Sequence, residues 1–380
     1  MLSEHILKLL RAGRSKALNI VEDSRATLQS ISEASYDREH ISAILKSAEK
    51  LSRGERNLIK KKYGPVIPCV SRGYDFFRAM KYMDVFNPDY VPSSFYYPYF
   101  LRVLNPANVK KLLCNKSLLK LIYQTDVRQP MTPLRSLAGV YFNSENEPIS
   151  PTKAVEIINS LNSPLIYKPS TDTNSGIGIR FIRRNEIKQL SDEILRREIF
   201  NPDNSDFVIQ VPVRQSEDTA RLNPSSLNCM RITTLNLNGM VSTHSMTIKC
   251  GPQNSFVDNI GNGKRGVMVG VSRDGRLNKT GFYGNGEQCT QHNNIKFEDI
   301  KIRNFDKVID AALKLHGMIE SCHVIGWDIA LDEDNEPVLI EGNTNYPGIS
   351  LEQMCSGPIF GDRTDEVVEY VLKYKQIIKR

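Results

Sequence analysis

The chain has 380 residues, 40% of them hydrophobic and 24% charged, and a formal net charge of +7. This length suffices for two or three domains with real cores, in the range of ordinary soluble proteins. No apolar run reaches the roughly 18 residues that would suggest a spanning helix. Glu4, His5 and Lys8 interrupt the segment in which a signal peptide needs an unbroken apolar core.

The seven cysteines are scattered and show no C-x-x-C spacing. This pattern favours free thiols over a disulfide framework or a zinc site, and it predicts a cytoplasmic protein. The positive charge has two readings. It would suit anionic partners such as nucleotides, acidic sugars, nucleic acid or a membrane surface, or it is an ordinary solvated surface.

Residues 1–62 carry apolar residues at helical spacing and few helix breakers, and we expect helices there. The stretch "FNPDYVPSSFYYPYFLRVLNP" is rich in proline and aromatics, and we expect an irregular segment that packs between the helical part and the rest. The stretch "NPANVKKLLCNKSLLKLIY" then predicts one helix, with Asn105 as its cap and Pro106 in its first turn.

Beyond about residue 163 the pattern changes to hairpins. "SPLIYKP" and "GIGIRFI" flank a polar loop, "FVIQVPV" predicts a short buried strand, and Asn238-Gly239 separates two alternating runs. Residues 305–319 predict an amphipathic helix. Helices followed by hairpins with interspersed helices indicate an α+β fold. We expect four segments: a helical region over 1–85, a linker region over 86–162, a smaller lobe over 163–215 and a larger lobe over 216–380.

The stretch "VIGWDIALDEDNEPVLIEGNTN", residues 324–345, predicts two apolar strands around an acidic turn. A hairpin loop of two or four residues sets Asp328 directly opposite Glu341, and Asn343 shares the face of Glu341. Like charges so placed destabilise a sheet. Two carboxylates and a carboxamide oxygen suit Mg²⁺, which would remove the repulsion. The alternative is that both acids point to solvent in a different register.

Three cationic features precede this hairpin. Lys168 ends a strand before a loop with Ser175, Gly176 and Gly178, which is either an anion-binding concavity or a flexible hairpin turn. Lys116 lies on the apolar arc of its predicted helix and either meets an anion or extends its ammonium to solvent.

Arg231 shares a strand face with Thr233. The Asn-Gly register places Met246 and His244 opposite, and Lys249 ends the partner strand. This face either binds a phosphate or carboxylate or forms a surface salt bridge.

Taken in order, these pieces resemble the ATP-grasp superfamily, most closely its sugar-transfer-associated branch, over about two-thirds of the chain. The most specific motif is "GWDIALDEDNEPVLIEGN". The resemblance implies an ATP-grasp fold, in which two α+β lobes hold ATP, behind an N-terminal helical region. It implies these site residues: magnesium ligands Asp328, Glu341 and Asn343; ATP contacts Lys116, Lys168, Ser175, Gly176, Gly178, Gln210, Val211 and Val213; catalytic cations Arg231 and Lys249; and substrate contacts Asp258, Asn259 and Asn345.

The sequence departs from the family pattern at two places. The hinge over adenine usually carries Glu after Gln, and "IQVPV" has Val211 there, so a side-chain contact is lost while backbone contacts remain possible. The paired glycines after Asp-Asn appear as "IGNGKRG", and Lys264 and Arg265 suggest an anionic substrate. Residues before about 85 lie outside the resemblance.

The reaction implied by the resemblance is ATP- and Mg²⁺-dependent carboxylate–amine ligation through an acyl phosphate, for instance of an amino acid with a uronic acid of a bacterial surface-glycan precursor. The partners would be a small-molecule or glycan carboxylate and an amine, with no specific nucleic acid. One rival is an ATP-grasp kinase, which would form ADP without an amine. The other is a non-catalytic anionic-glycan or nucleic-acid binding module, whose binding would depend steeply on salt and turn over no ATP.

Overall fold

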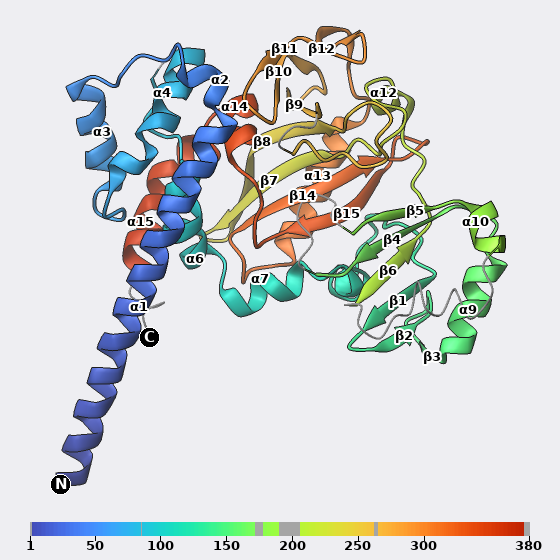
Figure 1. Cartoon of the computed structure of the whole chain (residues 1–380), viewed down its shortest axis with the longest axis horizontal. Coiled ribbons are helices and arrows are strands. Elements are labelled where there is room, and N and C mark those ends of the chain that lie inside the picture. The colour runs from blue at the N-terminus through green and yellow to red at the C-terminus, as the bar shows by residue number, and fades with distance from the viewer. Residues whose placement is uncertain (1, 85, 172–177, 190–205, 262–264, 376–380) are drawn as a thin grey trace.

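The structure is a computed structural model, and it describes residues 2–84, 86–171, 178–189, 206–261 and 265–375. Its described part contains a group of N-terminal helices, a smaller antiparallel sheet and a larger antiparallel sheet (Figure 1). This arrangement confirms the predicted α+β class.

The predicted N-terminal helices are present, and the first of them is 39 residues long. A capping box starts the third, because the Ser52 side chain accepts from the Glu55 amide while the Glu55 carboxylate accepts from the Ser52 amide. The helices of this region are α1 (Leu2–His40), α2 (Ser42–Leu45), α3 (Arg53–Tyr63) and α4 (Tyr74–Met83), with a 3₁₀ turn at Val70–Gly73.

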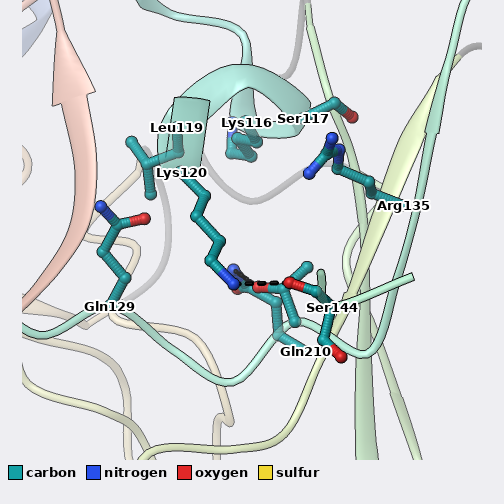
Figure 2. Close-up of a pocket in the computed structure, with 9 residues that line it drawn as sticks. Lys116, Ser117, Leu119, Lys120, Gln129, Arg135, Ser144 and Gln210 are labelled. Carbon is teal, nitrogen blue, oxygen red and sulfur yellow. Dashed lines mark hydrogen bonds between the residues drawn. The ribbon is translucent and has the colours of Figure 1, made fainter. Parts of the chain in front are cut away.

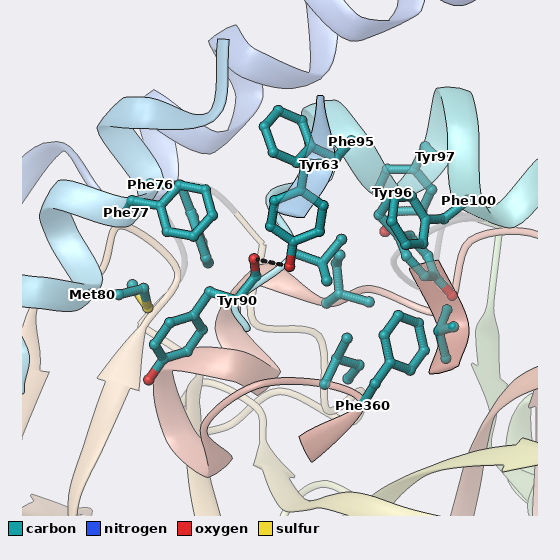
Figure 3. Packing of buried hydrophobic residues seen from close by; sticks show 14 of the residues in the cluster. Tyr63, Phe76, Phe77, Met80, Tyr90, Phe95, Tyr96, Tyr97, Phe100 and Phe360 are labelled. Carbon is teal, nitrogen blue, oxygen red and sulfur yellow. Dashed lines mark hydrogen bonds between the residues drawn. The ribbon is translucent and has the colours of Figure 1, made fainter. Parts of the chain in front are cut away.

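The aromatic segment after these helices is helical from residue 93 onward, so the expectation of an irregular segment is wrong there. It forms α5 (Ser93–Phe95), a π-helical turn (Tyr96–Phe100) and α6 (Leu101–Leu104). Its expected packing role is confirmed. Its rings lie in one hydrophobic core with Tyr63, Phe76 and the C-terminal Phe360, so this segment joins the N-terminal helices to the larger lobe (Figure 3).

The single helix expected over residues 105–123 is broken in two. It forms α7 (Ala107–Leu113), a 3₁₀ turn (Lys116–Leu118) and α8 (Leu119–Ile122). Asn115 causes the break, because its side chain accepts from the Ser117 amide and starts a new turn. Asn105 is not the cap. Its side chain instead donates to the carbonyls of Val324 and Thr344. The helical arc proposed for Lys116 therefore does not exist.

The smaller sheet has six antiparallel strands in the order β3-β2-β1-β6-β4-β5. The predicted hairpin on either side of the polar loop is confirmed, since Leu165 pairs with Ile182 and Tyr167 with Arg180. The elements of this lobe are β1 (Leu134–Leu137), β2 (Val140–Phe142), β3 (Pro148–Ile149), α9 (Pro151–Ser160), β4 (Leu165–Pro169), β5 (Arg180–Ile182), α10 (Arg184–Gln189) and β6 (Phe207–Gln210).

The larger sheet has seven antiparallel strands in the order β11-β10-β9-β8-β7-β14-β15. Helix α13 packs on one face against Trp327 and Ile325, so the opposite face is the one available for a site. The elements are α12 (Glu217–Ala220), β7 (Met230–Leu237), β8 (Met240–Cys250), β9 (Val267–Val271), β10 (Leu277–Tyr283), β11 (Gln288–Cys289), α13 (Phe305–Gly317), β14 (Val324–Leu331), β15 (Pro337–Asn343), α14 (Ser350–Ser356) and α15 (Thr364–Tyr374), with a separate pair β12 (Gln291–His292) and β13 (Ile295–Lys296) and 3₁₀ turns at Phe297–Asp299 and Gly361–Arg363.

The Asn238-Gly239 turn is confirmed: Leu237 pairs with Met240, and both turn residues have positive φ. The pairing predicted further along this hairpin is wrong. Ser245 lies opposite Thr233, and Thr247 lies opposite Arg231. The cause is a β-bulge, in which His244 is the extra residue and shifts every pair beyond it by one position.

All seven cysteines are free thiols, as predicted. None of the helices in the described part of the chain combines the length and apolar character that crossing a membrane requires.

Candidate active site between the two sheets

A row of charged residues crosses three strands of the larger sheet. Asp328 on β14 pairs with Glu341 on β15 and with Arg231 on β7. The predicted opposition of the two carboxylates is confirmed, although the turn differs from the expectation. The strands close at the pair Leu331–Pro337, and Ile340 is an extra residue that restores the register. A bulge beside the candidate site thus brings the two acids together.

Arg231 and Asp328 form a buried, two-point ion pair. Arg231 donates from Nε to Asp328 Oδ1 at 2.7 Å and from Nη2 to Oδ2 at 3.1 Å. Burial alone would raise the pKa of Asp328, but the charges of Arg231 and Lys249 outweigh it and hold that pKa well below its ordinary value. Asp328 is therefore a carboxylate at any physiological pH.

Lys249 ends β8 on the same face and joins this pair. Its Nζ lies 2.9 Å from Asp328 Oδ2 and 3.3 Å from Asp258 Oδ2. Burial would lower the pKa of Lys249, but Asp258 and Asp328 outweigh it and raise that pKa. Asn343 completes the group, because its Nδ2 donates to Asp328 Oδ2 at 3.3 Å. The cations Arg231 and Lys249 and the anions Asp328 and Asp258 thus alternate along this face and contact one another.

Lys116 reaches the same row from the broken helix region. Its Nζ donates to Glu341 Oε1 at 3.0 Å, and its backbone amide donates to the carbonyl of Ser170 beyond β4 at 3.0 Å. The start of a new turn at Asn115, rather than a helical arc, aims this side chain at the larger sheet.

Lys168 lies near the end of β4 and faces the same cavity. Burial lowers the pKa of Lys168, and attraction to Glu341 offsets part of that effect. Among the described residues, no hydrogen bond or ion pair is formed by its ammonium. Lys168 is thus a half-buried cation that Glu341 and Asp258 attract through space.

Most of the predicted site residues line one cavity of about 560 Å³, a size typical of small-molecule sites. Nine predicted residues contribute to its wall: Lys116, Lys168, Arg231, Lys249, Asp258, Asn259, Asp328, Glu341 and Asn343.

Five described residues of the predicted set lie outside this wall: Gly178, Gln210, Val211, Val213 and Asn345. Gly178 has a φ of +78°, and a Cβ there would lie 2.9 Å from Pro169 Cγ, so this turn requires glycine. Ser175 and Gly176 lie outside the described residues.

A second, much smaller hollow of about 10 Å³ lies beside strand β6 (Figure 2). Lys120 crosses it and donates to the Ser144 carbonyl at 2.5 Å. Gln210 donates from Nε2 to Thr132 Oγ1 at 3.2 Å, while its Oε1 is buried without a partner among the described residues. The Val211 amide donates to the Met131 carbonyl. Lys116 lines both hollows, so Gln210 and the charged row are close neighbours.

Sequence reasoning missed Glu352, which lies on α14 and covers the charged row. Its oxygens accept from Thr233 Oγ1 at 2.6 Å, Ser245 Oγ at 3.1 Å and Arg231 Nη1 at 3.2 Å. Burial raises the pKa of Glu352 to about 7, against the lowering effect of Arg231. Residues 349–354 read ISLEQM, a mixed polar and apolar stretch that offered no clear signal for Glu352.

The residues present fit a magnesium ion. Two carboxylates and a carboxamide oxygen are hard donors, and Mg²⁺ commonly binds one or two carboxylates together with substrate phosphates. Cationic nitrogens already contact both acids, since Lys116 touches Glu341 and Lys249 touches Asp328. Within the described ranges, no three His, Cys, Asp or Glu residues gather as a complete protein-only metal site. The phosphates of a nucleotide would have to supply the remaining ligands.

The family described as "Sugar-transfer associated ATP-grasp" matches residues 98–369. Among curated proteins there is no match. The VanG D-Ala:D-Ser ligase of Enterococcus faecalis is 13% identical with a TM-score of 0.42, over 70% of this chain and 62% of that one. The ATP-grasp ligase PsnB is 12% identical with a TM-score of 0.42, and the match covers 73% of this chain and 70% of PsnB. The biotin carboxylase of Campylobacter jejuni is 12% identical with a TM-score of 0.42, over 69% of this chain but only 47% of that one.

Proposed function

The chain belongs to the sugar-transfer associated ATP-grasp family and has the ATP-grasp fold, and from this premise we propose that it is an ATP- and magnesium-dependent carboxylate–amine ligase. One observation carries the proposal. The opposed acids Asp328 and Glu341 and four cationic side chains line the same cavity. A cavity with this charge pattern suits a metal-bound triphosphate.

The cations divide into two groups with different tasks. Lys116 and Lys168 hold the phosphates of the nucleotide as point charges, and Arg231 and Lys249 stabilise the group in transfer. Gln210, Val211 and Val213 form the hinge beside the nucleotide base, where backbone contacts replace the side-chain contact that valine cannot make. Asp328, Glu341 and Asn343 hold magnesium, which neutralises phosphate charge.

The chemistry needs positioning and charge neutralisation more than a protein nucleophile. A substrate carboxylate oxygen attacks the γ-phosphorus, the bond to the β–γ bridging oxygen breaks, and ADP leaves with an acyl phosphate formed. The nitrogen of a neutral amine then attacks the acyl carbon, the carbon–oxygen bond to phosphate breaks, and the amine proton leaves with inorganic phosphate. Amide, ADP and phosphate are the products.

The carboxylate substrate is a sugar acid or a surface-polysaccharide precursor, and Asp258 and Asn259 of the cavity wall contact it, whereas Asn345 lies outside that wall. The family's association with sugar transfer supports this class. A reaction that consumes ATP fits a cytoplasmic location, which stays a prediction.

A thermal-shift series tests the proposal: the chain alone, with ATP, and with ATP and Mg²⁺. Ligand at one hundred times its dissociation constant stabilises the folded chain by about 2.7 kcal/mol. We expect a Mg²⁺-dependent rise in melting temperature that Glu341→Gln weakens.

The matched control is Glu333→Gln, because Glu333 lies in the exposed turn of the same hairpin and its side chain is 60% exposed. It should behave as the wild type. A wild-type chain that no nucleotide stabilises, with or without Mg²⁺, would overturn the proposal. ADP formation that proceeds without an amine would instead favour a kinase.

A further inference from the structure

The cavity continues beyond the charged row to a wall made by helix α1. Glu33, Tyr36 and His40 contribute to this wall, together with Tyr97 and Tyr346. Helix α1 precedes the residues that match the family. The N-terminal region therefore adds to the cavity side chains that the family match does not cover.

Helix α1 is fixed in place by contacts on either side of Glu33. Ser30 Oγ donates to the Ser94 carbonyl at 2.8 Å. Asp37 is buried, and its Oδ1 accepts from Ser350 Oγ at 2.7 Å. Ser350 Oγ also lies 2.7 Å from Ser93 Oγ. The cavity wall is thus built from three distant parts of the chain held together by hydrogen bonds.

Glu33 is the distinctive residue of this wall. It is only 8% exposed, yet it lines the cavity. Tyr346 donates its hydroxyl to Glu33 Oε1 at 3.1 Å. Burial raises the pKa of Glu33 to about 7, against the lowering effect of hydrogen bonds from the Tyr346 and Gln29 side chains. A buried carboxylate whose hydrogen-bond donors are neutral is costly unless a cation also binds it.

Both ends of the cavity carry carboxylates, but lysine and arginine accompany them at one end only. The cations among the described wall residues, Lys116, Lys168, Arg231 and Lys249, belong to the row on the sheets, and no lysine or arginine of the described wall comes from α1. Burial also lowers the pKa of His40, which disfavours its charged form. A cationic group at the α1 end therefore meets the carboxylate of Glu33 with no lysine or arginine of α1 beside it.

Aromatic faces complete the α1 end. Tyr97 and Tyr346 stack with ring centroids 4.4 Å apart, and Tyr36 lies against His40 at 4.0 Å. Aromatic faces attract ammonium groups, most strongly where water is excluded. A cavity-lining carboxylate beside tyrosine rings is the chemistry that recognises a primary ammonium.

We propose that Glu33, with Tyr346 and Tyr97, forms the subsite that binds the ammonium group of the amine substrate. This inference rests on the proposed ligase function and deepens it, because it names the part of the chain that selects the second substrate. The carboxylate and the triphosphate occupy the end with the charged row, and the amine enters from the α1 end.

The test measures binding of two sugars that differ in one group, glucosamine and glucose, to the full chain by ligand-observed nuclear magnetic resonance. We expect the wild type to bind glucosamine at least tenfold more tightly than glucose. Glu33→Gln keeps the side-chain shape and removes the charge, so it should reduce this preference to threefold or less. Glu39→Gln, an exposed acid on the same helix, should leave the preference unchanged.

A second variant separates the loss of the Glu33 charge from a loss of folding. Glu33→Asp keeps the charge and should retain most of the preference, with a circular dichroism spectrum like that of the wild type. A wild type without preference for glucosamine, or a Glu33→Gln variant that retains it, overturns the subsite. Nucleotide binding is measured separately and without amine. A wild-type chain that binds no nucleotide would refute the ligase proposal. A wild-type chain that binds nucleotide but does not prefer glucosamine would refute only the subsite.

Discussion

The two sides of the nucleotide end of the cavity hold their cations in different ways. On the larger sheet, Arg231 is bonded to Asp328 and Glu352, and Lys249 lies against Asp328 and Asp258. On the smaller sheet, Lys168 is half-buried, burial lowers its pKa, and no hydrogen bond from its ammonium is present among the described residues. The cations of the first side are thus paired with carboxylates in the fold itself. On the second side, Glu341 attracts Lys168 without contacting it.

Replacing Arg231 would break the first side and have the largest effect on stability. Arg231→Met leaves the buried carboxylate of Glu352 without its cation and Asp328 with Lys249 alone. Breaking a buried ion pair by removing one partner costs about 3–5 kcal/mol. We expect a loss of this size in the free energy of unfolding, measured by urea denaturation.

Two further variants serve as comparisons for Arg231→Met. Lys168→Met replaces a half-buried cation by an apolar side chain of similar length, so stability should stay the same or rise while nucleotide affinity falls. Arg276→Met removes an exposed ion pair with Asp274 and should change stability by less than about 0.5 kcal/mol. If Arg231→Met and Lys168→Met destabilise equally, the contrast between the two sides is wrong.

The acid that covers the network predicts a pH dependence of stability. Burial raises the pKa of Glu352 from 4.5 to about 7. Between these values the folded chain binds a proton that the unfolded chain releases, so the free energy of unfolding falls as pH rises from 4.5 to 7. The contribution of Glu352 to this fall is about 3 kcal/mol at most. Urea denaturation at a series of pH values measures it.

Glu352→Gln should flatten the curve over that pH range, while Glu369→Gln on the exposed face of α15 should leave its slope unchanged. Glu33 acts in the same direction, because its pKa is also raised to about 7, so part of the slope remains in the variant. A Glu352→Gln curve that keeps the full wild-type slope would show that Glu352 is ionised throughout the range.

The sequence identified the row of acids better than it identified the structures that place them. Opposition of Asp328 and Glu341 followed from a simple hairpin, whereas the chain reaches it through a longer turn and a bulge at Ile340. At His244 the bulge shifts the register without a change in turn length that would restore it. The predicted partners of Arg231 and Thr233 are therefore wrong. Bulges depend on packing between strands, which a local pattern does not contain.

Local sequence patterns also failed to predict the surroundings of Lys116 and of the cavity wall on α1. The motif around Lys116 identified the residue, but the helix assumed around it is broken by the side-chain bond of Asn115. Glu33 carried no motif at all, because its environment depends on Tyr346, which lies 313 residues further along the chain. Contacts of that range arise only once the N-terminal helices pack against the larger lobe.

A glycine inside the network offers the mildest way to test its rigidity. Gly326 on β14 lies beside the ion pair, and a Cβ there would lie 3.2 Å from Pro347 Cβ and 3.3 Å from Arg231 Cδ. Both neighbours would have to move by a few tenths of an ångström. Arg231 is held at three points, by Asp328, Glu352 and the Pro347 carbonyl, so it has little freedom to move.

We therefore expect Gly326→Ala to cost about 1 kcal/mol of stability, since crowding outweighs the smaller backbone entropy of alanine. The same shift would move Asp328 and weaken the response to ATP with Mg²⁺ in the thermal-shift series. Gly317→Ala, where a Cβ meets nothing within 4 Å, is the control and should show neither effect. If Gly326→Ala were as stable as the wild type with an unchanged nucleotide response, the network would be adaptable. The difference between the two sides of the cavity would then lie only in their charges and not in their rigidity.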